Sequence, residues 1–82
     1  MNRKEIEEQY SDTELLFADG FDKAIVGVAR TFNNLSVAYD TNKCINILVK
    51  RDRMSREEAI EYFEYNVVGS YTGDHTPSFI ER

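Results

Sequence analysis

The stretch NKCINILVKRDRMSREEAIEYFEYN (residues 42–66) decides the fold, because each of its halves repeats apolar residues at helical spacing. In the first half, residues 42–51, this spacing gives an apolar stripe formed by Cys44, Ile45, Leu48 and Val49. Asp40 or Thr41 can cap such a helix, since short polar side chains accept hydrogen bonds from free backbone amides. We therefore expect a helix over residues 42–51.

The second half begins with a capping box. The Ser55 hydroxyl can accept from the Glu58 amide, and the Glu58 carboxylate can accept from the Ser55 amide. Apolar positions then recur at helical spacing at Ala59, Ile60, Phe63 and Val67. These signals predict a helix over residues 56–66, ending before Gly69. Because only residues 52–54 join the two helices, we expect them to pack together as an αα-hairpin.

Two short apolar runs precede these helices. Residues 24–29 and 35–39 flank the pair Asn33-Asn34, which is typical of an antiparallel hairpin. Another strand could come from Val67-Val68 and from residues 78–80. The predicted fold is a small single α+β domain, in which an antiparallel β-hairpin or three-stranded sheet packs against the two-helix hairpin.

Composition excludes several classes of protein. Of its residues 41% are hydrophobic, so the chain is too apolar for intrinsic disorder. With 82 residues it is too short for a second domain. No apolar run approaches the ~20 residues that cross a bilayer, and no apolar segment follows the basic pair near the N-terminus. We expect a cytoplasmic protein with no membrane partner.

Charge is distributed in blocks along the chain, whose net charge is −5. Residues 1–22 carry seven acids against two bases, residues 43–56 carry five bases against one acid, and residues 57–64 carry four glutamates. We interpret residues 1–18 as an acidic segment that is either helical or frayed, and residues 19–82 as a single domain.

Catalytic and metal chemistry find little support. The chain has one cysteine, Cys44, and one histidine, His75, and nothing in the sequence brings the two together. Cys44 lies on an apolar stripe, which indicates a buried core thiol, and His75 lies in a Gly- and Pro-containing loop. Asp19 and Asp22 flank a glycine without the ligand spacing of a calcium loop. We predict no enzyme activity, no metal site and no cofactor.

The basic block contains the patch Lys50, Arg51, Arg53 and Arg56. Such a patch can contact phosphates or an acidic protein, but the net negative charge and the neighbouring glutamates disfavour a nucleic-acid backbone. Cations near the end of a helix also complement its dipole. We therefore interpret the patch as a solvated face and expect no nucleic-acid partner.

Aromatic residues give the clearest sign of an interface. Tyr62, Phe63 and Tyr65 cannot all share one helical face, so either the helix is covered on two sides or some aromatic surface is exposed. Exposed tyrosines beside acids are typical of protein recognition. The candidate interface comprises Tyr62, Tyr65, Tyr71, Glu61, Asp19 and Asp22. A second cluster of polar groups, Asn66 and His75, could instead hold a small ligand.

Several segments together resemble small early-region proteins of tailed bacteriophages: residues 19–28 (DGFDKAIVGV), 37–40 (VAYD), 43–45 (KCI) with Leu48, 54–67 (MSREEAIEYFEYNV) and 69–71 with 76–77. The resemblance spans about residues 19–80 and leaves out the first 18 residues. It implies a phage protein acting in the cytoplasm of an infected bacterium. It supplies no activity and no catalytic residues that could be carried over to this chain.

The functional hypothesis is therefore a non-catalytic binding module that docks on a host or phage protein, as a host-takeover or anti-defence modulator. One alternative is a small-molecule binder or minor enzyme with its site between subunits, because a chain of this size rarely encloses a pocket alone. Another is a structural or assembly subunit. Monomer and homodimer are both compatible with the sequence.

Overall fold

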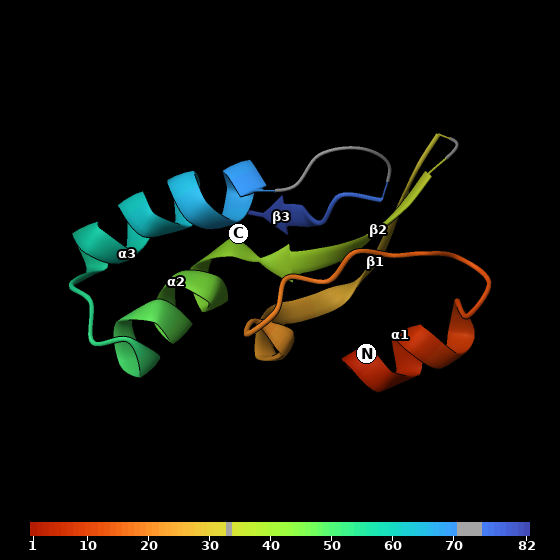
Figure 1. Ribbon diagram of the computed structural model, residues 1–82, viewed down its shortest axis with the longest axis horizontal. Helices are drawn as coiled ribbons and strands as arrows, with labels where there is room; N and C mark the ends of the chain where they lie inside the picture. The colour runs from red at the N-terminus through yellow and green to blue at the C-terminus, as the bar shows by residue number, and fades with distance from the viewer. Residues whose placement is uncertain (33, 71–74) are drawn as a thin grey trace.

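A three-stranded mixed sheet and three α-helices form the part of the chain that the computed structural model describes, residues 1–32, 34–70 and 75–82 (Figure 1). In chain order the elements are α1 (Arg3–Gln9), the short helical turn η1 (Asp22–Ala24), β1 (Ile25–Thr31), β2 (Asn34–Asp40), α2 (Thr41–Arg51), α3 (Arg56–Tyr62), the π-helical turn η2 (Phe63–Val67), the 3₁₀ turn η3 (Val68–Ser70) and β3 (Ser78–Ile80). The predicted α+β class is confirmed.

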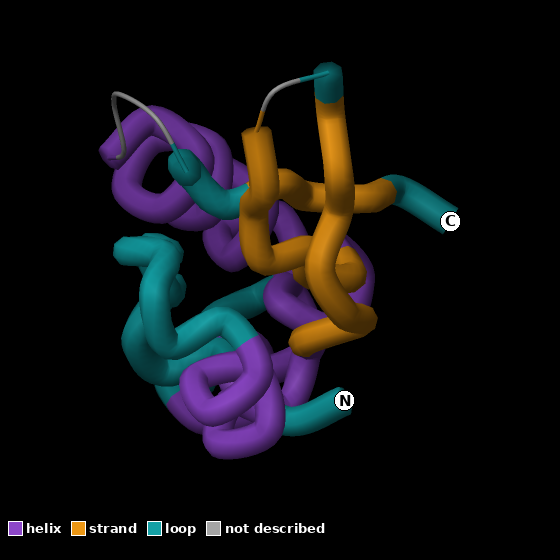
Figure 2. The backbone as a smooth tube through the Cα atoms, turned by 90° about the vertical axis from the view of Figure 1, so that its right-hand side faces the viewer, coloured by secondary structure: helices purple, strands orange, loops and turns teal. Residues whose placement is uncertain are grey.

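The predicted hairpin is formed by β1 and β2, which pair antiparallel. Thr31 lies opposite Asn34, so Asn34 is the first residue of β2. The other residue of the predicted turn, Asn33, lies outside the described residues. At the other end of the hairpin, the register shifts between Ile25 and Gly27. Such a bulge increases local twist. Viewed from the side, the strands cross one another at an angle (Figure 2).

The third strand, β3, lies beside β2 and runs parallel to it, with Phe79 opposite Tyr39. A parallel neighbour needs a long crossover connection, and α2 and α3 provide it. The expectation of a strand at residues 78–80 is confirmed, whereas a strand at Val67-Val68 is wrong. Val67 is buried four residues after buried Phe63, so the apolar stripe of α3 continues as a helix through η2.

Both helix starts follow the predicted capping. Asp40 caps α2 by accepting from the Lys43 amide at 3.0 Å. At the start of α3, the Glu58 amide donates to Ser55 Oγ and the Ser55 amide donates to Glu58 Oε1, each at 3.1 Å. Helix α2 begins one residue before the predicted position, and α3 begins at the predicted position. The second continues through η2 and then through the 3₁₀ turn η3 to Ser70, so the predicted end at residue 66 and the stop before Gly69 are wrong.

Aromatic rings join the sheet to the helices. The ring of Phe79 lies 5.7 Å from that of Tyr39 and packs edge-on against Phe63 at 5.1 Å. Tyr39 and Phe63 are almost completely buried, as are Leu48 and Cys44 from α2. The αα-hairpin is thus fixed to the sheet through a core that both helices share.

The N-terminal segment packs on the same core. Helix α1 begins at a capping box between Asn2 and Glu5, and its Ile6 is fully buried. Residues 10–21 run from α1 back across the sheet to η1 (Figure 1). Along this path the Ala18 amide donates a hydrogen bond of 2.8 Å to the buried Tyr39 hydroxyl. Residues 1–18 therefore contribute to the core cluster that the sheet and α2 form.

No helix within residues 1–32, 34–70 and 75–82 combines the length and the hydropathy that crossing a bilayer requires.

Candidate functional site

The α3–η2 helix carries an exposed surface that we call the tyrosine face: Tyr62, Tyr65 and Val68, with Glu58, Glu61 and Glu64 around them. Tyr65 is 83% exposed and Tyr62 is 41% exposed. Ala59, Phe63 and Val67 form the buried stripe of the same helix, which leaves the opposite positions facing solvent. The open question about the aromatic cluster is thereby answered: Phe63 is core, and the two tyrosines are surface.

The tyrosine face spans a change in helix geometry. At Val68 the backbone amide donates to the carbonyl of Phe63, five residues earlier, so η2 is a π-helical turn. Such turns are rare and occur frequently at functional sites. Tyr65 lies at the middle of this turn, between buried Phe63 and buried Val67. The turn therefore presents a large aromatic side chain to solvent at a fixed place.

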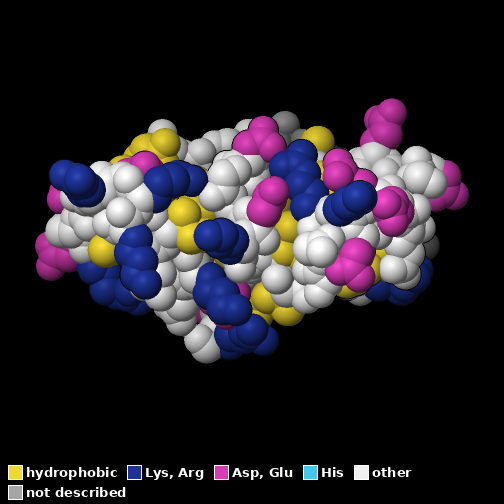
Figure 3. Space-filling view, turned by 90° about the horizontal axis from the view of Figure 1, so that it is seen from below, with side chains coloured by type: hydrophobic (Ala, Val, Ile, Leu, Met, Phe, Trp, Pro, Cys, Tyr) yellow, Lys and Arg dark blue, Asp and Glu magenta, His cyan; other side chains and the backbone are white. Residues whose placement is uncertain are grey.

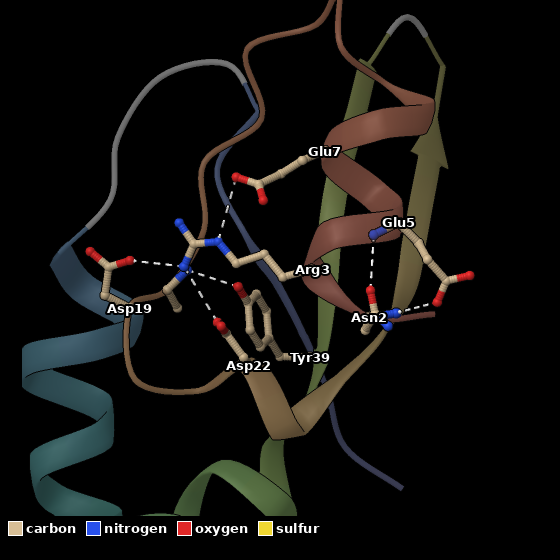
Figure 4. Close-up of polar contacts among 8 residues, drawn as sticks. Asn2, Arg3, Glu5, Glu7, Asp19, Asp22 and Tyr39 are labelled. Atoms are coloured by element: carbon tan, nitrogen blue, oxygen red, sulfur yellow. Dashed lines mark hydrogen bonds and ion pairs between the residues drawn. The ribbon is translucent and has the colours of Figure 1, made fainter.

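Asp19 and Asp22, the acidic members of the predicted interface, both contact Arg3. Arg3 Nη1 lies 3.1 Å from Asp19 Oδ1 and 3.4 Å from Asp22 Oδ1, and Arg3 Nε lies 3.8 Å from Glu7 (Figure 4). The pKa of Arg3 is raised, chiefly because Asp19 accepts its hydrogen bond. This cluster links α1 to η1 and to the loop before it. The sequence reasoning missed Arg3, because its partners lie 16 and 19 residues away.

Arg51, the last residue of α2, contacts the same loop. It donates to the Gly20 carbonyl at 2.9 Å and to both carboxylate oxygens of Asp52, and its guanidinium lies 5.4 Å from the centre of the Phe21 ring. Its pKa is raised, chiefly by the hydrogen bond to Asp52, with a smaller electrostatic contribution from Tyr62. Arg51 therefore contacts the segment between Asp19 and Asp22, and of the tyrosines Tyr62 acts on it electrostatically.

The other predicted site residues are not assembled into one cluster. The ring Nδ1 of His75 lies 2.7 Å from the carbonyl oxygen of Leu35, near the start of β2. Asn66 is exposed in η2, and its carbonyl accepts from the Ser70 hydroxyl. Within the described ranges no hydrogen bond joins Asn66 to His75. Tyr71 lies outside the described residues.

The single thiol is confirmed as a core residue. Cys44 is fully buried in α2, and desolvation raises its pKa to about 12. A thiol with such a pKa is almost entirely protonated near neutral pH and is a poor nucleophile or metal ligand. Across the part of the chain that the structure describes, no group of three or more His, Cys, Asp or Glu side chains is placed to hold a metal ion.

The structure divides the basic patch that the sequence suggested. Arg56 donates to the side-chain oxygens of Asn42 and Asn46 at 3.3 Å each. Lys50 and Arg51 line a different surface, a groove between α2 and η1 that also includes Lys43 and Lys23. The sequence did contain one sign of this groove: Lys43 and Lys50 are seven residues apart, which places them on the same face of a helix.

Comparison of the chain with protein families, with curated proteins and with solved structures found no match.

Proposed function

We propose that this protein is a non-catalytic binding module that docks on another protein through the tyrosine face. The main support for this proposal is that Tyr65 is 83% exposed and lies beside the partly exposed Tyr62. The opposite side of their helix is buried in the core. Tyrosine is enriched at the centres of protein interfaces, where its ring buries a large area and its hydroxyl keeps a polar partner. A helix anchored in this way presents its outer side chains with little loss of conformational entropy on binding.

The negative charge around the tyrosine face favours a partner with a basic surface. Glu58, Glu61 and Glu64 surround the tyrosines and all are exposed. A rim of acids around apolar and aromatic groups favours a partner with cations around a hydrophobic patch, and it speeds the encounter at low ionic strength. The resemblance to phage early-region proteins supports a host or phage protein as this partner. A basic surface that ordinarily holds nucleic acid is one that such a module could occupy in its place.

The non-catalytic part of the proposal has its own support. Cys44 is buried with a pKa of about 12. The Nδ1 atom of His75 is engaged with the backbone at Leu35. Cys44 is therefore not available as a nucleophile for His75 to activate.

The first test is capture of a stoichiometric partner from bacterial lysate by the full chain and by two variants. Tyr65→Ser removes the exposed ring from the tyrosine face. Phe32→Ser is the matched control, because Phe32 is 99% exposed on the hairpin, away from this face. A central interfacial tyrosine contributes about 2 kcal/mol, so Tyr65→Ser should weaken binding of the captured protein roughly thirtyfold.

Phe32→Ser should retain the partner with unchanged affinity, and raising the salt concentration should slow association because the rim is acidic. The proposal is contradicted if the wild-type chain retrieves no protein at fixed stoichiometry. It is equally contradicted if both variants bind a retrieved protein as tightly as the wild type does.

A further inference from the structure

A groove between α2 and η1 concentrates positive charge on this acidic protein. The groove has a volume of about 780 Å³ and is lined mainly by Lys23, Lys43, Asn46, Ile47, Lys50 and Arg51. This volume lies within the range of roughly 300–1,000 Å³ that small-ligand sites occupy. Viewed from below, Lys and Arg side chains gather on the half of the molecule that carries α2 (Figure 3).

The cations reach the groove from two elements. Lys43 and Lys50 lie two turns apart on one face of α2, about 10 Å along its axis, and Ile47 lies between them. Lys23 comes from η1, the other wall. Within residues 1–32, 34–70 and 75–82, none of these three ammonium groups forms an ion pair. Three flexible ammonium groups can therefore converge on one multiply charged anion.

The remaining charged groups of the groove are already engaged. Arg51 binds Asp52 and the Gly20 carbonyl. Asp22, the acid among the lining residues, lies 3.4 Å from Arg3, which reduces its effect on an anionic ligand. Two more acids, Asp40 and Asp52, lie near the ends of α2, and each of them also binds an arginine. The ammonium groups of the three lysines are thus the charged groups of the groove that remain available to a ligand.

We propose that this groove binds a small organic phosphate, with its phosphate groups on Lys23, Lys43 and Lys50 and its organic part on Ile47. Lysine acts as a point charge toward phosphate, whereas recognition of a planar carboxylate favours an arginine fork, and the guanidinium of Arg51 is already engaged. Ile47 and the methylene stems of the lysines supply apolar contact area. The proposal is independent of the tyrosine face.

A compact ligand fits the surroundings better than a polynucleotide does. A nucleic-acid strand would continue beyond the groove over a chain that carries seven acids in residues 5–22 and four in residues 57–64. These acids would repel its phosphates. A small polyphosphate places all of its charge between the three lysines.

Titration of the full chain with ATP, followed by amide NMR shifts and calorimetry, tests the proposal. We expect saturable shifts confined to residues 20–23 and 43–51. Lys43→Ala combined with Lys50→Ala should weaken ATP binding at least about tenfold, because each hydrogen bond to a charged group adds that much. The matched control is Lys4→Ala, which removes a charge from α1 outside the groove and should leave the affinity unchanged. Amide shifts far from the groove report whether each variant remains folded.

Inorganic triphosphate and a short single-stranded oligonucleotide serve as competing probes. ATP should bind more tightly than triphosphate, because only ATP has an organic part for Ile47. Equal affinity for the two would overturn the role of Ile47. Tighter binding of the oligonucleotide, shifts that do not saturate, or equal affinity of the double variant would overturn the site.

Discussion

At the scale of single residues, the Tyr39 hydroxyl joins the N-terminal segment to the sheet. It accepts a 2.8 Å hydrogen bond from the Ala18 amide, although the two residues are 21 positions apart. Tyr39 is fully buried on β2, and Ala18 is 1% exposed in the loop that returns from α1. This bond satisfies a buried backbone donor of the N-terminal segment inside the core of the sheet. An amide buried there without a partner would destabilise the fold.

Replacing Tyr39 with phenylalanine keeps the ring and leaves the Ala18 amide without this acceptor. We expect Tyr39→Phe to lower the free energy of unfolding by about 1–3 kcal/mol in urea denaturation. The Ala18 amide should also exchange faster with deuterium. Tyr65→Phe removes the same hydroxyl from an 83% exposed residue and should change stability by less than about 0.5 kcal/mol. Equal effects of the two substitutions would show that the buried hydrogen bond does not stabilise the protein.

At the scale of elements, Asp40 joins the end of β2, the start of α2 and the C-terminal strand segment. One carboxylate oxygen accepts from the Lys43 amide at 3.0 Å, and the other accepts from Arg82 Nε at 2.8 Å. These contacts lower the pKa of Asp40 below its ordinary value of 3.8, chiefly through the hydrogen bond from Arg82. A folded-state pKa below the unfolded one stabilises the fold above the unfolded pKa, and this contribution disappears as the pH falls through the folded pKa.

Asp40→Asn tests this contribution, because asparagine retains the helix cap and loses the charge that pairs with Arg82. The wild type should be more stable than Asp40→Asn at pH 6, and the difference should shrink as the pH falls below about 3.8. Thermal unfolding between pH 7 and pH 2.5 measures it. Asp12→Asn changes the net charge equally at an exposed position and serves as the control. A difference from wild type that is the same at all pH values would refute the ionic contribution of Asp40.

The elements that the sequence predicted well are those with local signals. The capping box at Ser55 and the apolar stripe of residues 44–49 each act within a few residues, so both helix starts were predicted within one position. The parallel direction of β3 and the contact of Ala18 with Tyr39 depend on segments far apart in the chain, which periodicity does not reveal. The same limit applied to the candidate sites. Helical geometry showed only that Tyr62, Phe63 and Tyr65 cannot share one face, and the structure was needed to show that Tyr65 is the most exposed of them. The groove needed Lys23 of η1 placed beside α2.

At the scale of the whole molecule, charge and shape separate two surfaces. The molecule measures 39 × 22 × 20 Å, and Lys and Arg are concentrated toward the end that carries α2, with acids predominating toward the end that carries α1 (Figure 3). Helix α3 adds a third region, where acids surround exposed tyrosines. A small protein with such distinct regions can engage a basic protein on one surface while a different surface holds a small anion. The proposed function depends most on whether the tyrosine face contacts another protein.

Photo-crosslinking from position 65 tests that central claim most directly. A benzophenone side chain replaces Tyr65 in one version of the full chain and Phe32 in another, and both are illuminated in bacterial lysate. Because both positions are exposed, the two versions sample the lysate equally. The account predicts one dominant adduct, with a protein carrying a basic surface, from position 65 and not from position 32. Adducts that are identical from both positions, or that contain only a second copy of this chain, would contradict it.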